Sequence, residues 1–370
     1  MTTRIGHQGR LLRNAAYELK DIWSPTVKGG IHLKGWKLMA IARMKVSNLF
    51  DQCTYRKHHR WIRLQFLIAA LIAAAVPLAH AMPQDSPRSE IVNVEALMTR
   101  VGPPSPLAIK EFKNAGMEGV RPHTLTASER TTVEVTLASL PLLTRRVLEK
   151  KLHYLAFVDG IPGEGTGLTS PVAKTGLYDI TLRASILDEP LSIFLTTKER
   201  RLFTNDGTGL TIMVSGTGTD ALTYVLLHES AHVVDNSCGI TANPRSRFVA
   251  DIWASQKRFV PRLEASVVAA TAFHGGRPLR IGQAAAVYDA MAQTGFVSLY
   301  ATHGSLDDFA ELVAWREILV QHQGNLVIEV KDASGKSLGR WEPLTFPEVQ
   351  KRFEDVDKLL ASPATCRGVV

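Results

Sequence analysis

Two histidines and a glutamate lie close enough in the sequence to act together, in the segment His228-Glu-Ser-Ala-His232. Residues four apart share one face of a helix, so both imidazoles can bind one metal ion. Glu229 follows His228 directly and so falls beside the ion, where a general base for a metal-activated water is needed. The pattern predicts a zinc site. Two histidines stacked by chance on a core helix are the simpler alternative.

The element that must position these residues is a buried helix. An apolar run from Ala221 to Asp235 surrounds the motif, and no Pro or Gly interrupts it before Gly239. Thr219 or Asp220 can cap its first turn. The sequence therefore predicts that both histidines project from a continuous helix in the core.

Catalytic zinc usually has three protein ligands and an open fourth position. Glu311 is the first candidate for the third ligand. Ser305 can cap the helix that carries it, and Asp307 and Asp308 fall in the first turn, where the helix dipole favours acids. Apolar neighbours surround Glu311, and a buried carboxylate needs a cation partner. That partner is the metal or, in the alternative interpretation, Arg316.

Two other residues compete for the third position. Cys238 lies ten residues after His228, where an extended H-E-x-x-H-x-x-G-x-x-H motif places its third histidine. That motif has a glycine at its eighth position, which is Asp235 in this chain. Asp235 is itself the third candidate, although accepting a hydrogen bond from a ligand imidazole suits it better.

These residues resemble a known group of enzymes. The segment H-E-S-A-H-V-V-D, followed downstream by Tyr300-Ala and by Asp308-Phe-Ala-Glu311, is similar to the gluzincin zinc metallopeptidases. The most similar branch contains lethal-factor-type toxin proteases and related exported bacterial proteins. The chain departs from the thermolysin-type pattern, in which an Asp follows the Glu by four residues, because Trp315 stands there. The gap of 79 residues between His232 and Glu311 is also long.

The resemblance implies the remaining roles and the fold. Glu311 would complete a ligand set with His228 and His232, and Tyr300 would donate a hydrogen bond to the oxyanion of the tetrahedral intermediate. Tyr288 and His303 are rivals for this last role. The implied fold is a zincin-like α+β metallopeptidase domain, with a small twisted sheet, an active-site helix and a mostly helical lower lobe.

Periodicity and turn residues predict the other elements. Apolar or alternating runs indicate four strands before the motif helix, and Asn205-Asp-Gly207 is typical of a hairpin turn. An edge strand of this sheet can hold an extended peptide. The expected strands are 153–158, 178–183, 191–195, 210–214, 326–330 and a return strand ending at 341. The expected helices are 89–100, 128–152 interrupted by Pro141, 243–259, 281–294 and 347–360.

The N-terminal part has the pattern of an export signal. Basic residues from Arg56 to Arg63 precede the apolar run Phe66–Val76, and small residues, Ala79 and Ala81, stand where a signal peptidase reads. We therefore expect a signal peptide at 44–81 and a mature domain at 82–370, secreted or periplasmic without a stable membrane anchor. An uncleaved anchor is the alternative. Since Met39 and Met44 lie just upstream, residues 1–43 are interpreted as a mis-assigned, disordered extension.

Charge and cysteine content narrow the class of protein. Residues 1–81 carry 13 Lys and Arg against 3 Asp and Glu, whereas 82–370 carry 30 against 32. The mature part offers no electrostatic case for nucleic-acid binding. It keeps two cysteines, Cys238 and Cys366, which an exported protein can join in a disulfide.

The sequence thus predicts an exported zinc peptidase that binds one Zn²⁺ and acts on a peptide or protein substrate. Glu229 would take a proton from the attacking water and pass it to the leaving amine. Two alternatives are a zinc hydrolase of another amide, such as a cell-wall peptide, and a catalytically silent zincin-fold binding module. The presence of Glu229 favours an active enzyme.

Overall fold

The computed structural model describes residues 94–362, 366 and 368–369, all within the compact unit Gln84–Val370. The predicted extension at 1–43, the signal peptide at 44–81 and the first residues of the predicted helix 89–100 lie outside the described residues. No helix in the described part of the chain combines the length and the apolar character needed to cross a membrane.

The described chain has a mixed α+β architecture, as predicted. The α-helices are α1 Val94–Met98, α2 Pro106–Asn114, α3 Ala127–Ser139, α4 Leu142–Lys151, α5 Leu191–Arg200, α6 Ala221–Cys238, α7 Pro261–Glu264, α8 Ala284–Ala292, α9 Ser305–Gln321 and α10 Pro347–Ala361. The short 3₁₀ helices are η1 Ala184–Asp188, η2 Val267–Ala270, η3 Ala272–His274, η4 Ile281–Gln283, η5 Tyr300–His303 and η6 Pro343–Thr345.

Two sheets flank the helices. The larger has the order β1-β2-β4-β3, in which β2 and β4 are parallel and the other pairs are antiparallel. The second has the antiparallel order β11-β10-β6. The strands are β1 Glu118–Pro122, β2 Leu152–Ile161, β3 Gly167–Val172, β4 Leu177–Arg183, β5 Phe203–Thr204, β6 Thr211–Gly216, β7 Trp253–Ser255, β8 Arg258–Phe259, β9 Leu279–Arg280, β10 Leu326–Lys331 and β11 Ser337–Trp341.

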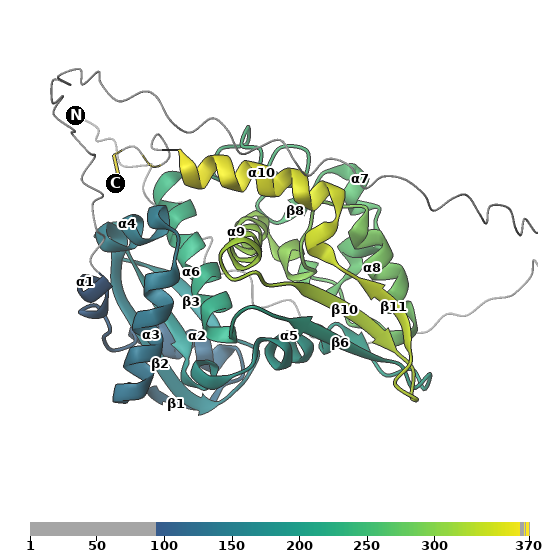
Figure 1. The fold of residues 1–370 in the computed structure, drawn as a ribbon, viewed down its shortest axis with the longest axis horizontal. Helices are drawn as coiled ribbons and strands as arrows, with labels where there is room; N and C mark the ends of the chain where they lie inside the picture. The colour runs from purple at the N-terminus through teal and green to yellow at the C-terminus, as the bar shows by residue number, and fades with distance from the viewer. Residues whose placement is uncertain (1–93, 363–365, 367, 370) are drawn as a thin grey trace, which may run out of the picture. The chain divides into compact units, whose positions relative to one another are not determined.

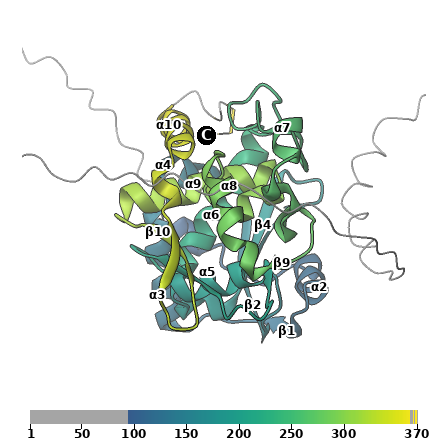
Figure 2. The same cartoon turned by 90° about the vertical axis from the view of Figure 1, so that its right-hand side faces the viewer.

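Helix α6 occupies the centre of this arrangement (Figures 1 and 2). It packs against β3 and β4 of the larger sheet on one side and against α9 on another. The Asp220 carboxylate caps it by accepting a hydrogen bond from the Thr223 amide at 2.8 Å. Gly239 ends it in the left-handed conformation, with φ of 66°, which glycine adopts without steric cost. Both predicted ends of the motif helix are confirmed.

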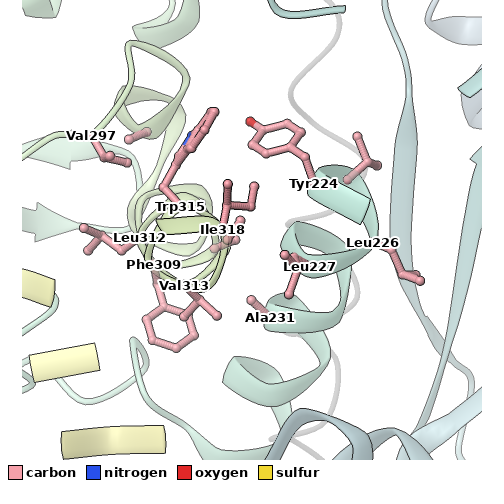
Figure 3. Packing of buried hydrophobic residues seen from close by; sticks show 14 of the residues in the cluster. Tyr224, Leu226, Leu227, Ala231, Val297, Phe309, Leu312, Val313, Trp315 and Ile318 are labelled. Atoms are coloured by element: carbon pink, nitrogen blue, oxygen red, sulfur yellow. The ribbon is translucent and has the colours of Figure 1, made fainter. Parts of the chain in front are cut away.

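Packing between α6 and α9 fixes the elements that carry the site. Figure 3 shows Leu227 and Ala231 pointing from α6 toward α9, while Leu226 points to the opposite side. Trp315 and Ile318 of α9 are fully buried in the same hydrophobic core. Each fully buried side chain of this size contributes about 1.5–3 kcal/mol, so apolar contact holds the two helices together.

The predicted strand 191–195 is a helix, α5, and that prediction is wrong. Leu191, Phe194 and Leu195 are buried while Ile193 is exposed, which is the spacing of a helix face. The short apolar run fits either period, and the helix is selected because it seals one face of β6.

Two further local predictions are wrong. The segment Asn205-Asp-Gly207 is not a hairpin turn, because β5 pairs with β9 and β6 pairs with β10 in a different sheet. The segment 243–259 is not a helix but a series of turns leading into the small β7–β8 ribbon. The other strands and helices predicted within the described residues are present, with ends shifted by a few residues.

Cys238 and Cys366, whose pairing the sequence left open, form a disulfide, with 4.8 Å between the two Cα atoms. Cys238 is the last residue of α6. The bridge closes a loop of 128 residues that contains α9. It therefore ties the helix of the motif to the segment that follows α10.

Candidate metal centre and cleft

The two histidines of the motif converge with an aspartate from α9. The Nε2 atoms of His228 and His232 are 3.1 Å apart, and each lies 3.8 Å from Oδ1 of Asp307. Each residue offers one ligand atom to the same small space. His228, His232 and Asp307 therefore form a group that could hold a metal ion.

The spacing of these atoms fits a tetrahedral ion. Bonds of about 2.0–2.1 Å in tetrahedral geometry place ligand atoms roughly 3.3–3.4 Å apart. The observed separations of 3.1 and 3.8 Å bracket that value. Two nitrogens and one carboxylate oxygen are also the donor types of a catalytic zinc site, in which three protein ligands leave one position open.

The pKa values in this group show that it attracts positive charge. Burial alone would lower the pKa of His228, but the carboxylates of Asp307 and Glu311 raise it to about 9. Burial would raise the pKa of Asp307, yet contacts with His228 and His303 hold it well below its usual value. Burial and the neighbouring His228 lower the pKa of His232, which favours the neutral form that binds metals.

Glu311, expected as the third ligand, lies on the other side of the His228 ring. Its Oε1 is 2.9 Å from Nδ1 of His228, whereas the shared space is at Nε2. It also accepts hydrogen bonds from the hydroxyls of Tyr224 and Ser298. Asp307, and not Glu311, therefore shares the Nε2 side with the two histidines, while Glu311 forms an ion-pair contact with the Nδ1 side of His228. A carboxylate on that side is the usual partner of a ligand imidazole.

Asp307 and Glu311 reach both sides of one imidazole because they are four residues apart on α9. Glu311 is fully buried. Burial would raise its pKa, but His228, Lys198 and Ser298 lower it to about 2, so the group is ionised. The His303 ring holds Asp307 from the solvent side, with Nδ1 2.8 Å from Oδ2.

The other two candidate ligands are engaged elsewhere. Cys238 is bonded to Cys366 and so offers no thiolate. The Asp235 carboxylate accepts hydrogen bonds from the amide and hydroxyl of Thr241, at 2.7 and 2.6 Å. It fixes the chain just beyond α6, and its predicted hydrogen bond to a ligand imidazole is not formed.

Glu229, the predicted general base, is held by the edge strand β3. The hydroxyl of Thr169 lies 2.8 Å from Oε2 of Glu229 and 3.0 Å from its carbonyl oxygen. Gly167 of the same strand passes directly over the carboxylate, since a Cβ there would stand 2.5 Å from Oε1. A larger residue at 167 would therefore displace the Glu229 carboxylate, which Gly167 and Thr169 of β3 hold in place.

Tyr300, the predicted oxyanion donor, stands next to the cluster at the start of η5. Its ring centre is 5.6 Å from that of His228. Burial and the carboxylates of Asp307, Glu229 and Glu311 raise the pKa of Tyr300 well above its usual value, so the phenol keeps its proton. A protonated phenol beside the reacting atoms can donate a hydrogen bond to a developing oxyanion.

The rivals for that role have other contacts. Tyr288 is fully buried and donates a hydrogen bond to Glu199 at 2.9 Å. His303 contacts Asp307, as described above. His274, a further loop histidine, stacks on Phe259 with a centroid distance of 3.8 Å and contacts the carbonyl oxygen of Thr302.

The cluster opens into a cleft of about 620 Å³. Its floor is formed by Tyr224, Val225, His228 and Glu229 of α6. One wall is the loop 162–166 with the start of β3, and the other is α5 with η3 and η5. This volume suits several residues of an extended chain or a small molecule, since typical binding sites range over about 300–1,000 Å³.

Sequence reasoning missed three residues of the site. Asp307 had a signal, because it lies one helical turn before Glu311 and shares its face. Thr169 and Lys198 had none, because the expected strands do not include β3 and the start of α5 was expected to be a strand. Their positions depend on which elements pack against α6.

No family model, curated protein or solved structure matches this chain. Its chemistry is therefore inferred from the geometry of the cleft and the cluster.

Proposed function

We propose that this protein is an exported zinc-dependent peptidase with a zincin-like arrangement of helix and edge strand. The observation that carries the proposal is the convergence of His228, His232 and Asp307, with His228 and the neighbouring Glu229 lining an open cleft. A cluster of two imidazoles and one carboxylate is the donor set of a catalytic zinc site. The segment His228–His232 resembles the gluzincin motif. We assign the third ligand to Asp307 instead of Glu311.

The chain's own residues would divide the reaction among them. A zinc ion held by His228, His232 and Asp307 would activate water and polarise the scissile carbonyl. Glu229, oriented by Thr169, accepts the proton of the attacking water and delivers it to the leaving amine. Tyr300 donates a hydrogen bond to the oxyanion. Glu311 keeps the proton on Nδ1 of His228 and so leaves Nε2 available for the metal.

The edge strand supports a peptide as the substrate. β3 pairs with β4 on one side, and no described strand pairs with its other side. Its first residue, Gly167, lines the cleft beside Glu229. An extended peptide could add to this edge by main-chain hydrogen bonds and bring its carbonyl over the cluster.

The proposed export agrees with the Cys238–Cys366 disulfide, because such bridges persist in oxidising compartments. Periplasm and extracellular medium both meet that condition. The signal peptide that would direct export is the sequence prediction for 44–81.

The test combines metal analysis with hydrolysis of a peptide library. We expect one zinc per chain, cleavage by the wild type, and no cleavage by Glu229→Gln although zinc is retained. Glu164→Gln, which removes an exposed carboxylate from the lip of the same cleft, is the matched control and should stay active.

Other outcomes would point to the alternatives. Zinc without cleavage of any peptide would indicate a silent binding module, and cleavage limited to cell-wall peptides would indicate the other amide hydrolase. Full activity in Glu229→Gln would overturn the mechanism.

A further inference from the structure

A lysine in the cleft wall has no anionic partner. The Nζ atom of Lys198, on α5, lies 3.2 Å from the ring centre of Tyr300. The rings of Phe194, Tyr224 and Phe273 surround it at 5.8 to 6.0 Å. Within the described part of the chain, no carboxylate forms an ion pair with this ammonium group. Lys198 lines the same cleft as His228 and Glu229.

The carboxylates that act on Lys198 already contact other groups. Burial lowers the pKa of Lys198, and the carboxylates of Glu311, Asp307, Glu199 and Glu229 oppose this shift, although each has polar partners of its own. Aromatic faces compensate a desolvated ammonium group only in part. Lys198 is therefore a cation whose best partner would be an anion that enters the cleft.

A second cation lies one turn further along the same helix. Arg201 lines the cleft mouth and donates to the carbonyl oxygens of Gly163 and Glu164, both at 3.3 Å. No carboxylate pairs with it among the residues that the structure describes. Arg183, also in the cleft, provides the contrast, since Glu189 neutralises it. The α5 wall thus carries two uncompensated positive charges three residues apart.

We propose that Lys198 and Arg201 form a carboxylate-recognition subsite, so that the enzyme selects peptides with an acidic group near the scissile bond. That carboxylate comes either from an Asp or Glu side chain or from a free C-terminus. The inference rests on the proposed peptidase function and adds the class of substrate. Charge-assisted hydrogen bonds from Lys and Arg to a carboxylate are the contacts that would provide the selection.

The test uses the full, zinc-loaded protein and a matched peptide series. One Glu is moved through the positions around the scissile bond, with Gln peptides as neutral partners, and each peptide is made with a free or an amidated C-terminus. For the preferred position, kcat/KM should be roughly 10- to 100-fold higher for the acid than for its neutral partner. A Glu effect identifies a side-chain carboxylate as the ligand, and a C-terminal effect identifies the free terminus.

Three variants test whether the preference for acidic peptides comes from Lys198 and Arg201. Lys198→Met should bring the acid-to-neutral ratio close to one, and Lys198→Arg should retain most of it. Arg201→Met, at an exposed residue, should lower the ratio by a smaller factor. Lys113→Met removes an exposed lysine on α2, outside the cleft, and should leave the ratio unchanged. Equal losses on acidic and neutral peptides in Lys198→Met would show that Lys198 only positions Tyr300, and would overturn the proposal.

A binding measurement separates this inference from the proposed function. Affinities of the same peptides for zinc-loaded Glu229→Gln do not depend on turnover. Tighter binding of acidic peptides, lost when Lys198→Met is added, would support the subsite even if no peptide were hydrolysed. Equal binding of acidic and neutral peptides would reject the subsite, whereas hydrolysis by the wild type would still support a peptidase.

Discussion

The floor and the walls of the cleft are built differently. The floor, formed by α6 and backed by α9, places polar side chains between buried apolar residues, and Asp307 and Glu311 of α9 contact its His228. The walls are formed by β3 and α5. β3 brings the Gly167 backbone and the Thr169 hydroxyl against Glu229. The α5 side carries two cations, Lys198 and Arg201, that pair with no carboxylate among the described residues. The comparison suggests that the floor determines the chemistry and that the walls determine orientation and selectivity.

The largest effects should come from the two acids on the floor. Asp307→Ala removes a proposed ligand, so its affinity for zinc should fall further than that of Glu311→Ala. Glu311→Ala removes only the partner of His228 and should cost about 10- to 100-fold. Zinc affinities from chelator competition would check the order. The reverse order would return the third position to Glu311.

The anchoring of the floor can be tested next. Cys366→Ser opens a loop of 128 residues at the end of α6, and the free energy of unfolding should fall by about 2–4 kcal/mol. Urea unfolding of the wild type and the variant, both under oxidising conditions, would measure it. Cys238→Ser and the double variant should lose the same amount, because all three lack the same bond. Additive losses would mean that the cysteines stabilise the fold by other contacts.

The closest contact between wall and floor is at Gly167. In Gly167→Ala the new methyl group would meet the Glu229 carboxylate, since the ideal Cβ lies 2.5 Å from Oε1. Displacing a catalytic group by about 1 Å can cost up to about 100-fold in rate, so kcat should fall while zinc stays bound. Gly176→Ala, at an exposed turn with φ of 71°, would lose stability through its backbone without touching Glu229, so it controls for the effect of lost stability on kcat. Unchanged kcat in Gly167→Ala would show that β3 does not fix Glu229.

The smallest effect concerns the buried side of the α5 wall. Burial raises the pKa of Glu199 from 4.5 to about 7, although Tyr288 and Lys198 oppose the shift. The folded protein then holds a proton that the unfolded chain releases, so the free energy of unfolding falls as pH rises from 4.5 to 7. The fall should be about 1–3 kcal/mol. Urea titrations at several pH values should show less of this slope in Glu199→Gln, and an equal slope would exclude Glu199 as its source.

The sequence predicted the floor better than the walls. The spacing of His228 and His232, the Asp220 cap and Gly239 are local signals, and they define α6 without knowledge of its neighbours. Its partner α9 was equally clear as a helix. The choice between Asp307 and Glu311 was not, because it depends on how α9 is rotated and shifted against α6. Asp307 and Glu311 lie four residues apart on the same side of α9, so either could be the ligand while the same apolar face of α9 packs in the core.

The walls could not be predicted for a different reason. Leu191–Leu195 is too short and too apolar for its period to distinguish a strand from a helix. The glycines from 160 to 167 are typical of a loop, yet Gly167 begins β3 and lies against the carboxylate of Glu229, 62 residues later. Contacts of this kind leave no local pattern, so the Thr169 and Lys198 roles became visible only in three dimensions.

The distance in sequence between the parts of the centre also has a consequence for the timing of activity. Asp307 follows His232 by 75 residues, and β3 and α5 precede both. The proposed general base, the three proposed ligands and both walls come together only when segments from β3 to α9 have packed around α6. The proposed activity would therefore arise only after these distant segments had folded together.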